Sequence, residues 1–397
     1  MCFDGPMAPL RSPCRGPFIT AAAATRALAL AALIALAVSA PVLGQGQGAP
    51  VFTPKLSLPL DCRVGVDCWI AAHVDLDPGP GFADYACGRL GYDGHKGTDI
   101  AIRDRRAMAE GVAVLAAAPG IVGNWRDGMA DIGVREAGRR RAIEGRECGN
   151  GLTIDHGMGW TTQYCHMGRG SVDVVTGQAV TAGQGIGLVG LSGKTSYPHL
   201  HFALRLKREV VGPFAGLGPG GKPETRLSGR TARRKAREKA REKGRGEAKA
   251  GRCGAGAGAL WRAEVLAALP YRPVVIFNAG FAGTAPEVAD VRKGRYRGGV
   301  LADDAGALVL WAELFGVAKG DRLRLRLIAP DGTAFADRLV VLEKHQARRF
   351  QYVGKKLGRA SWPLGRYRGE VTLTRRGLAP SAATVARREL IVRRATY

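Results

Sequence analysis

Residues 152–165, LTIDHGMGWTTQYC, contain the clearest local structural signal in the chain. The runs 152–155 and 161–165 have the composition of short strands, and the glycine-rich segment 156–160 between them is typical of a hairpin loop. If the two runs pair, Cys148 and Cys165 end near each other. We therefore expect a disulfide between Cys148 and Cys165.

Further short, glycine-punctuated runs surround this hairpin on both sides. They have the length and spacing of strands in an antiparallel sheet. The runs lie at 112–116, 120–125, 179–181, 186–190 and 200–206. The pattern predicts one mostly antiparallel sheet domain over residues 61–221.

The chain becomes strand-like again from about residue 270. Leu323-Arg324-Leu325-Arg326-Leu327 alternates apolar and charged residues, as a half-buried strand does. Pro330-Asp331-Gly332 is a turn signal between two strands. The strand-like segments are 273–281, 307–315, 322–330, 338–343, 367–376 and 387–395. We expect a small β-sandwich over residues 253–397, and hence a mostly β protein.

Charge is the most unusual feature of the composition. The 397 residues carry a formal net charge of +25, which favours anionic partners. Residues 222–252 hold 13 Lys/Arg against 4 Glu and have almost no apolar face. This basic low-complexity insertion is either a solvated charged helix or a disordered segment, and it would also suit electrostatic contact with an anionic envelope surface. It lacks aromatic residues for base stacking, so we expect no specific nucleic-acid binding.

The N-terminus resembles a secretory signal. Residues 21–43 form an apolar stretch interrupted only by Arg26, and Arg11 and Arg15 precede it. We expect a signal peptide at 1–44, a linker at 45–60, and an exported protein of the periplasm or cell envelope. A retained membrane anchor is the alternative. Six cysteines follow the signal, an even number that suits disulfides in an oxidising compartment.

Histidines concentrate in the first sheet domain, where six of the seven lie between residues 73 and 201. His199 and His201 are two apart on a predicted strand, so their side chains share a face about 7 Å apart. Two imidazoles in that arrangement suit a metal, or a metal and an attendant base, although a pair of surface histidines has the same spacing.

His95 and Asp99 add a second half to this pattern. They are four residues apart across a glycine turn and can bend onto one centre. Two imidazole nitrogens and one carboxylate oxygen suit zinc, with the fourth position left for water, as in catalytic rather than structural zinc sites. Water activated at such a site needs further groups to move protons, and histidine is suited to that role.

Taken together, these motifs resemble the lysostaphin-type peptidases, the M23 family of LytM-like zinc endopeptidases. The resemblance rests on His95-x-x-x-Asp99, Tyr164-Cys165-His166 and His199-x-His201. It extends over the surrounding segments DYACGRLGYDGHKGTDIAI (84–102), ECGNGLTIDHGMGWTTQYCHMGRGS (147–171) and VTAGQGIGLVGLSGKTSYPHLHFALR (180–205).

The resemblance implies an antiparallel β-sheet groove holding one zinc ion per chain, with His95, Asp99 and His201 as ligands. It also implies that His166 and His199 are unliganded catalytic histidines. The activity that follows is hydrolysis of peptide bonds in peptidoglycan, in the stem peptide or the cross-link. The alternatives are a catalytically inactive wall-binding or amidase-activating relative, and a zinc-carrying wall-binding module.

The remaining histidines are expected to lie outside the site. His156 matches a family position that is not a ligand, so we interpret it as structural. His73 is expected in a loop or at the surface, and His345, isolated in the second half of the chain, at the surface.

Overall fold

The computed structural model describes residues 53–79, 81–134, 139–218, 221–225, 253–358, 361–376 and 384–396. Those from Thr53 onward belong to one compact unit. The predicted signal peptide, residues 45–52 of the predicted linker and residues 226–252 of the basic insertion lie outside the described residues. Among the helices that are described, none has the length and hydropathy needed to cross a membrane.

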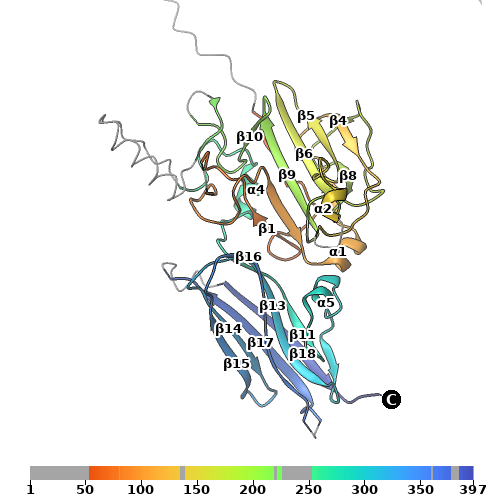
Figure 1. The fold of residues 1–397 in the computed structure, drawn as a ribbon, viewed down its shortest axis with the longest axis vertical. Coiled ribbons are helices and arrows are strands. Elements are labelled where there is room, and N and C mark those ends of the chain that lie inside the picture. The colour runs from red at the N-terminus through yellow and green to blue at the C-terminus, as the bar shows by residue number, and fades with distance from the viewer. Residues whose placement is uncertain are drawn as a thin grey trace, which may run out of the picture. The chain divides into compact units, whose positions relative to one another are not determined.

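An eight-stranded antiparallel sheet forms the first part of the described chain. Its strand order is β1-β2-β9-β6-β5-β4-β7, and β10 pairs with β9 (Figure 1). The strands are β1 (Cys68–Ala72), β2 (Thr98–Ile102), β4 (Gly120–Arg126), β5 (Asn150–Asp155), β6 (Trp160–Met167), β7 (Ala179–Val180), β9 (His199–Leu206) and β10 (Glu209–Val211). A separate two-stranded sheet consists of β3 (Ala113–Leu115) and β8 (Gly185–Leu188).

The predicted hairpin is confirmed. β5 and β6 pair antiparallel across residues 156–159, and the disulfide Cys148–Cys165 is present. Two further disulfides, Cys62–Cys68 and Cys87–Cys253, account for the other four cysteines beyond residue 60.

Strand β9 shows how the sheet separates its core from its functional face. Leu200, Phe202 and Leu204 alternate along β9 and are fully buried in the main core of this part of the chain. His199 and His201 occupy the intervening positions, so they project from the opposite face. One strand therefore supplies both packing and two of the predicted site residues.

Four short helices are described. They are α1 (Arg105–Glu110), α2 (Arg139–Ala142), α4 (Ala263–Ala268) and α5 (Val288–Lys293). Asp104 caps α1, because its carboxylate accepts a hydrogen bond from the Ala107 backbone N–H at 2.9 Å.

The second part of the described chain is a two-sheet sandwich, and the described residues as a whole are mostly β, as predicted. One sheet has the order β11-β13-β16 and the other β12-β18-β17-β14-β15. Leucines of β13 and β14 from the two sheets meet in one core. The strands are β11 (Val275–Ala282), β12 (Val300–Ala302), β13 (Ala307–Val317), β14 (Arg322–Ile328), β15 (Ala334–Val341), β16 (Gln346–Lys356), β17 (Gly365–Thr374) and β18 (Thr384–Arg393).

A third, smaller core joins the two parts. It includes Trp69 and Ala101 from the first sheet, and Phe277 and Phe315 from the sandwich. Leu260 and Trp261, which precede the sandwich strands, are buried in the core of the first sheet. The domain boundaries expected from the sequence stay predictions.

Candidate metal centre and active site

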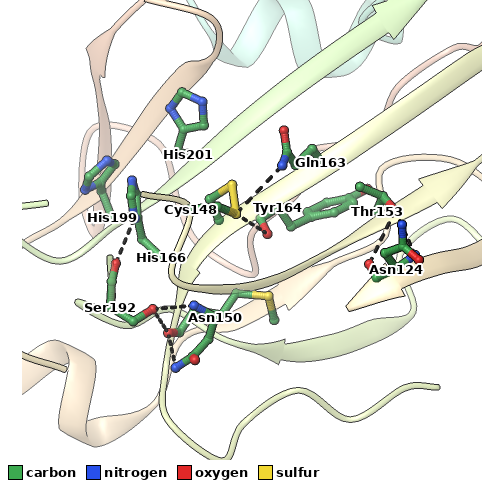
Figure 2. The surroundings of a disulfide bond; sticks show 12 residues. Asn124, Cys148, Asn150, Thr153, Gln163, Tyr164, His166, Ser192, His199 and His201 are labelled. Atoms are coloured by element: carbon green, nitrogen blue, oxygen red, sulfur yellow. Dashed lines mark hydrogen bonds between the residues drawn. A yellow bond between two sulfur atoms is a disulfide. The ribbon is translucent and has the colours of Figure 1, made fainter. Parts of the chain in front are cut away.

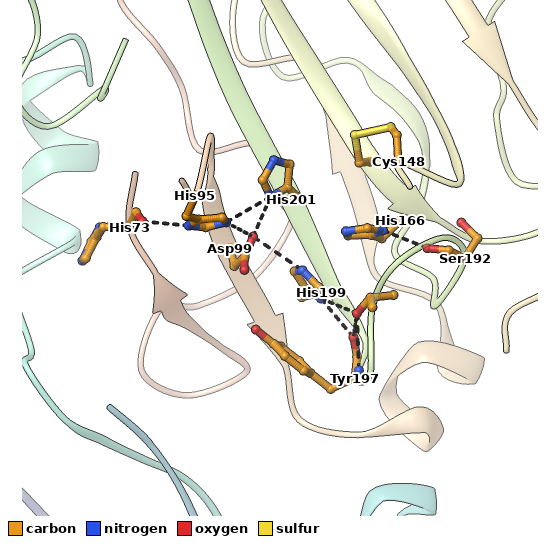
Figure 3. Close-up of polar contacts among 11 residues, drawn as sticks. His73, His95, Asp99, Cys148, His166, Ser192, Tyr197, His199 and His201 are labelled. Carbon is orange, nitrogen blue, oxygen red and sulfur yellow. Dashed lines mark hydrogen bonds and ion pairs between the residues drawn. A yellow bond between two sulfur atoms is a disulfide. The ribbon is translucent and has the colours of Figure 1, made fainter. Parts of the chain in front are cut away.

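The three predicted metal ligands converge. His95, Asp99 and His201 offer ligand atoms that all lie within 4.8 Å of one another. The Oδ1 atom of Asp99 lies 2.8 Å from His201 Nδ1 and 3.1 Å from His95 Nε2 (Figure 3). The two imidazole nitrogens are 3.2 Å apart.

Strand register explains why these residues meet. In the antiparallel pair β2–β9, Asp99 lies directly opposite His201, so the two side chains share a face of the sheet. His95 approaches from the turn before β2. Gly97 keeps that turn clear, since a side chain there would lie 2.6 Å from imidazole atoms of His201.

Backbone contacts fix the orientation of His95. Its Nδ1–H donates to the carbonyl oxygen of His73 at 2.7 Å, which leaves the Nε2 lone pair facing Asp99 and His201. The carboxylate of Asp75 ties together the loop that precedes His95. It accepts hydrogen bonds from the backbone N–H groups of Asp77, Ala83 and Gly94.

The two predicted catalytic histidines stand beside this cluster. His199 Nε2 lies 3.5 Å from Asp99 Oδ1, while its Nδ1 lies 3.0 Å from the carbonyl oxygen of Tyr197. The Nδ1–H of His166 donates to the Ser192 carbonyl oxygen at 2.8 Å. The rings of His166 and His199 are 4.8 Å apart. Both rings are therefore held through Nδ1, which leaves Nε2 available in the neutral form.

His166 reaches this position through an irregularity in β6. Asn150 pairs with Met167 and Gly151 pairs with Cys165, so His166 is an extra residue without a partner, a β-bulge. Its φ of 65° lies in the left-handed region, which is uncommon for a residue with a side chain. A strained, bulged residue with buried polar contacts is often found at a functional site.

The disulfide Cys148–Cys165 anchors this bulge. Figure 2 shows it close to His166 and His201. The backbone N–H of His166 donates to the Cys148 carbonyl oxygen at 2.8 Å, so the disulfide-linked segment holds His166 directly.

Burial and neighbouring charges set the protonation states of the cluster. Burial alone would raise the pKa of the Asp99 carboxyl, but His95 and His199 outweigh burial and hold that pKa well below its usual range. Burial lowers the pKa of the His166 imidazole, and the neighbouring His199 and His201 lower it further. Asp99 is therefore ionised and His166 neutral at neutral pH.

The donor set fits a zinc ion. Two imidazole nitrogens and one carboxylate oxygen are a known zinc ligand set, and metal binding requires an ionised carboxylate and neutral imidazoles. The His95 lone pair is already oriented by a backbone carbonyl, as is usual for metal-ligating histidines.

The other histidines lie elsewhere. His156 hydrogen-bonds to the Pro119 carbonyl oxygen at 2.7 Å and to the Thr162 hydroxyl at 2.8 Å, which agrees with a structural role. His345 is exposed, as expected. His73 lies in the loop after β1, which is one of its two expected positions, but it is not at the surface: it is 3% exposed, and its ring packs edge-on against Tyr85 and Phe214.

Sequence reasoning missed the groups that orient the site histidines. These are the carbonyl oxygens of His73, Ser192 and Tyr197. A backbone carbonyl is present at every residue, so residue type carries no signal for this role. The burial of His73 had a weak signal, since it follows the apolar run of β1.

A protein-family model matches the part of the chain that holds this cluster. Residues 93–213 match the model of peptidase family M23, a stretch that contains all five predicted site residues. These residues therefore form an M23 peptidase domain, and the suspected family is confirmed for this part of the chain.

The chain is also similar to two curated proteins of Vibrio cholerae. It is 40% identical over 63 residues to the peptidoglycan DD-endopeptidase ShyA and 38% identical over 63 residues to the peptidoglycan DD-endopeptidase ShyB. Each match covers 16% of this chain and 14% of the relative. The similarity thus spans a small part of either protein.

Solved structures of this kind also match. The catalytic domain of the prophage-encoded M23 protein EnpA from Enterococcus faecalis has 24% identity and a TM-score of 0.25, over 44% of this chain and 94% of that one. The catalytic domain of lysostaphin from Staphylococcus simulans has 24% identity and a TM-score of 0.23, over 34% and 86%.

Proposed function

We propose that the protein is a zinc-dependent endopeptidase that hydrolyses peptide bonds in bacterial peptidoglycan. The observation that carries the proposal is the convergence of His95, Asp99 and His201, drawn from a turn and two strands, within 4.8 Å. These residues would hold one zinc ion and leave a coordination position open. A bound zinc ion supplies an activated water and polarises the scissile carbonyl group.

Two side chains of the protein would then carry out proton transfer and stabilise the oxyanion. His166 is buried and neutral, so its free Nε2 can accept a proton from the attacking water. His199 stands beside His166 with Nε2 toward Asp99, and in its imidazolium form the Nε2–H can donate a hydrogen bond to the developing oxyanion. Because Nδ1 of each ring is held by a backbone carbonyl, neither ring needs to reorient during the reaction.

Peptidoglycan as substrate is supported by the M23 domain and by similarity to two peptidoglycan endopeptidases. An exported location in the periplasm or cell envelope belongs to the same proposal. It is supported by the three disulfides, since disulfides persist in oxidising compartments. The charge of +25 would assist association with an anionic envelope, with the basic insertion at 222–252 as the contact.

Digestion of purified peptidoglycan tests the activity. We expect soluble peptide fragments with new amino termini, loss of release after chelation, and recovery when zinc is restored. Mass analysis of the fragments identifies the bond that is cut. The His201→Ala variant should bind peptidoglycan but release nothing. Binding without release by the zinc-loaded wild-type protein would favour the alternative, a non-catalytic wall-binding or amidase-activating relative.

A further inference from the structure

The sandwich forms one side of the cavity that leads to the proposed metal centre. This cavity, of about 790 Å³, is lined by Asp99, His166 and His199 of the peptidase part. It is also lined by two sandwich segments, Phe315–Ala318 and His345–Arg348. A substrate that fills this cavity would therefore touch the sandwich as well as the peptidase sheet.

The first sandwich segment is fixed in place. The guanidinium of Arg375 donates to the Gly316 carbonyl oxygen at 2.7 Å and to both carboxylate oxygens of Asp321 at 2.8 and 2.7 Å. Asp321 in turn accepts from the Ala318 backbone N–H at 2.7 Å. Gly316 has a φ of 71°, and a side chain there would meet Leu90 of the peptidase part at 2.7 Å. This wall is thus built into the fold.

The second segment is fixed to the catalytic region through Arg348. Its guanidinium lies over the rings of Tyr197, at 5.2 Å, and Phe277, at 5.0 Å. It also forms an ion pair with the fully buried Glu313 at 3.0 Å. The Tyr197 ring in turn stacks on His199 with centroids 4.5 Å apart. The sandwich therefore packs against Tyr197, the residue on which the proposed catalytic residue His199 stacks.

The charged side chains around the cavity are mostly positive. Four lining residues are Lys or Arg, namely Arg89, Lys194, Arg348 and Arg375, and Asp99 is the single carboxylate among the lining residues. Arg348 and Arg375 are paired with acids, and Asp99 belongs to the proposed metal centre. Arg89 and Lys194 are exposed. The guanidinium of Arg89 lies over the Phe82 ring at 5.0 Å and Lys194 interacts electrostatically with the exposed Glu147, so both cations remain accessible to a ligand from solvent.

We propose that this cavity is the substrate groove, that the sandwich completes it, and that it selects a peptide with a free carboxylate. Lys194 follows the segment whose Ser192 carbonyl holds His166, and Lys194 and His166 both line the cavity. Arg89 lies on the peptidase segment that faces the sandwich wall. Apolar side chains such as Tyr92 and Val317 also line the cavity and suit the rest of the peptide. The inference rests on the proposed function for the identity of the ligand as a peptide.

Binding of a labelled peptide tests the charge selection. The probe is a fluorescent tetrapeptide with a free C-terminal carboxylate, compared with the same peptide as a carboxamide. The full chain carries His166→Ala so that the probe is not consumed. We expect the carboxylate to bind at least about fivefold more tightly, and Lys194→Gln to remove most of that preference. Lys293→Gln, an exposed lysine on α5 away from the cavity, is the matched control and should change nothing.

Two alanine-to-tryptophan substitutions on the sandwich test whether the sandwich forms one side of the groove. Ala347 is exposed and lines the cavity, whereas Ala334 is exposed and does not. Ala347→Trp should weaken binding of both peptides by obstructing the groove, while Ala334→Trp should leave binding intact. Equal binding of carboxylate and carboxamide, or wild-type binding by Ala347→Trp, would overturn the inference. These results can be distinguished from a failure of the proposed activity. A wild-type protein that cleaves peptidoglycan but binds the carboxylate and the carboxamide equally contradicts the groove assignment alone. Conversely, selective binding by a protein that cleaves nothing contradicts only the proposed activity.

Discussion

His199 and His201 show how two like residues on one face of a strand take different positions. His201 Nδ1 lies 2.8 Å from Asp99 Oδ1, within the ligand cluster, whereas His199 Nε2 lies 3.5 Å away and its other nitrogen faces the Tyr197 carbonyl. Spacing alone predicted that both would reach the site. It did not distinguish the ligand from its neighbour, and that assignment came from the family resemblance.

The first prediction separates these two roles. We expect His199→Ala to retain about one zinc ion per chain while turnover falls by at least about a hundredfold, because a group that stabilises the oxyanion is lost and no ligand is removed. His201→Ala is the comparison variant and should lose zinc as well as activity. Zinc content measured by elemental analysis beside peptidoglycan hydrolysis makes the distinction. Loss of zinc from the His199→Ala variant would count against the assignment.

A second prediction concerns His156, which lies outside the cluster. Burial lowers the pKa of its imidazole, although its hydrogen bond to the Pro119 carbonyl opposes this effect. The unfolded chain therefore binds a proton to this residue at a higher pH than the folded protein does. The stability contributed by neutral His156 is full above the unfolded pKa of about 6.5 and falls as the pH drops below it.

The His156→Gln variant isolates this effect. We expect it to cost more unfolding free energy at pH 8 than at pH 5, since only the wild-type residue takes up a proton when the chain unfolds. Urea unfolding at the two pH values measures the difference. A cost that is the same at both would show that His156 does not titrate on unfolding.

At the scale of elements, strand β6 combines a disulfide, a bulge and a site residue within its last three positions. Cys165 forms the disulfide with Cys148, His166 is the bulged residue, and Met167 resumes the pairing with β5. The hairpin and its disulfide could be predicted, because alternating strands around a glycine turn bring their outer ends together. The bulge could not, because one additional residue in a pairing depends on the partner strand.

The third prediction tests this disulfide. Replacing Cys148 and Cys165 together with alanine should lower the unfolding free energy by about 3 kcal/mol, the value expected for a loop of this length. Replacing the pair Cys62 and Cys68, whose sequence separation is 6 rather than 17, should cost less. In the wild-type protein, Cys148 and Cys165 should resist alkylation until a reductant is added. Prompt labelling of both in the native protein would reject the pairing.

Strand β16 is the longest element that sequence reasoning missed. Its sequence, QARRFQYVGKK, has no regular alternation, because it pairs only with β13 and Gln351 is its one buried residue. Strands such as β14 were predicted, since their leucines face the sandwich core at every second position. Strands could therefore be predicted from the sequence where one of their faces is buried and the other exposed.

At the scale of the whole molecule, the two cores are connected by a small set of buried contacts. Arg297 of the sandwich part forms ion pairs with Asp104 at 2.6 Å and with Glu110 at 3.0 Å, at the two ends of helix α1. The side chain of Asp104 is 1% exposed, so it depends on Arg297 for its charge balance. The sequence predicted both sheet parts but gave no sign of this pairing, which joins residues 193 positions apart.

The fourth prediction tests that connection. Arg297→Met should lower the unfolding free energy by about 3 kcal/mol, because a buried carboxylate is left without its partner. Arg295→Met removes an exposed pair with Asp290 and should cost less than about 1 kcal/mol. Calorimetry of both variants gives the comparison, and equal effects would contradict the role assigned to Arg297.

The whole account depends on one divalent ion being held where a turn and two strands meet, at His95, Asp99 and His201. The most direct test is the zinc content of the folded full-length protein after equilibration with zinc and removal of the excess. We predict one zinc ion per chain in the wild type and far less in Asp99→Ala and His201→Ala variants that remain folded by circular dichroism. A folded wild-type protein that holds no zinc, or variants that keep all of it, would contradict the account.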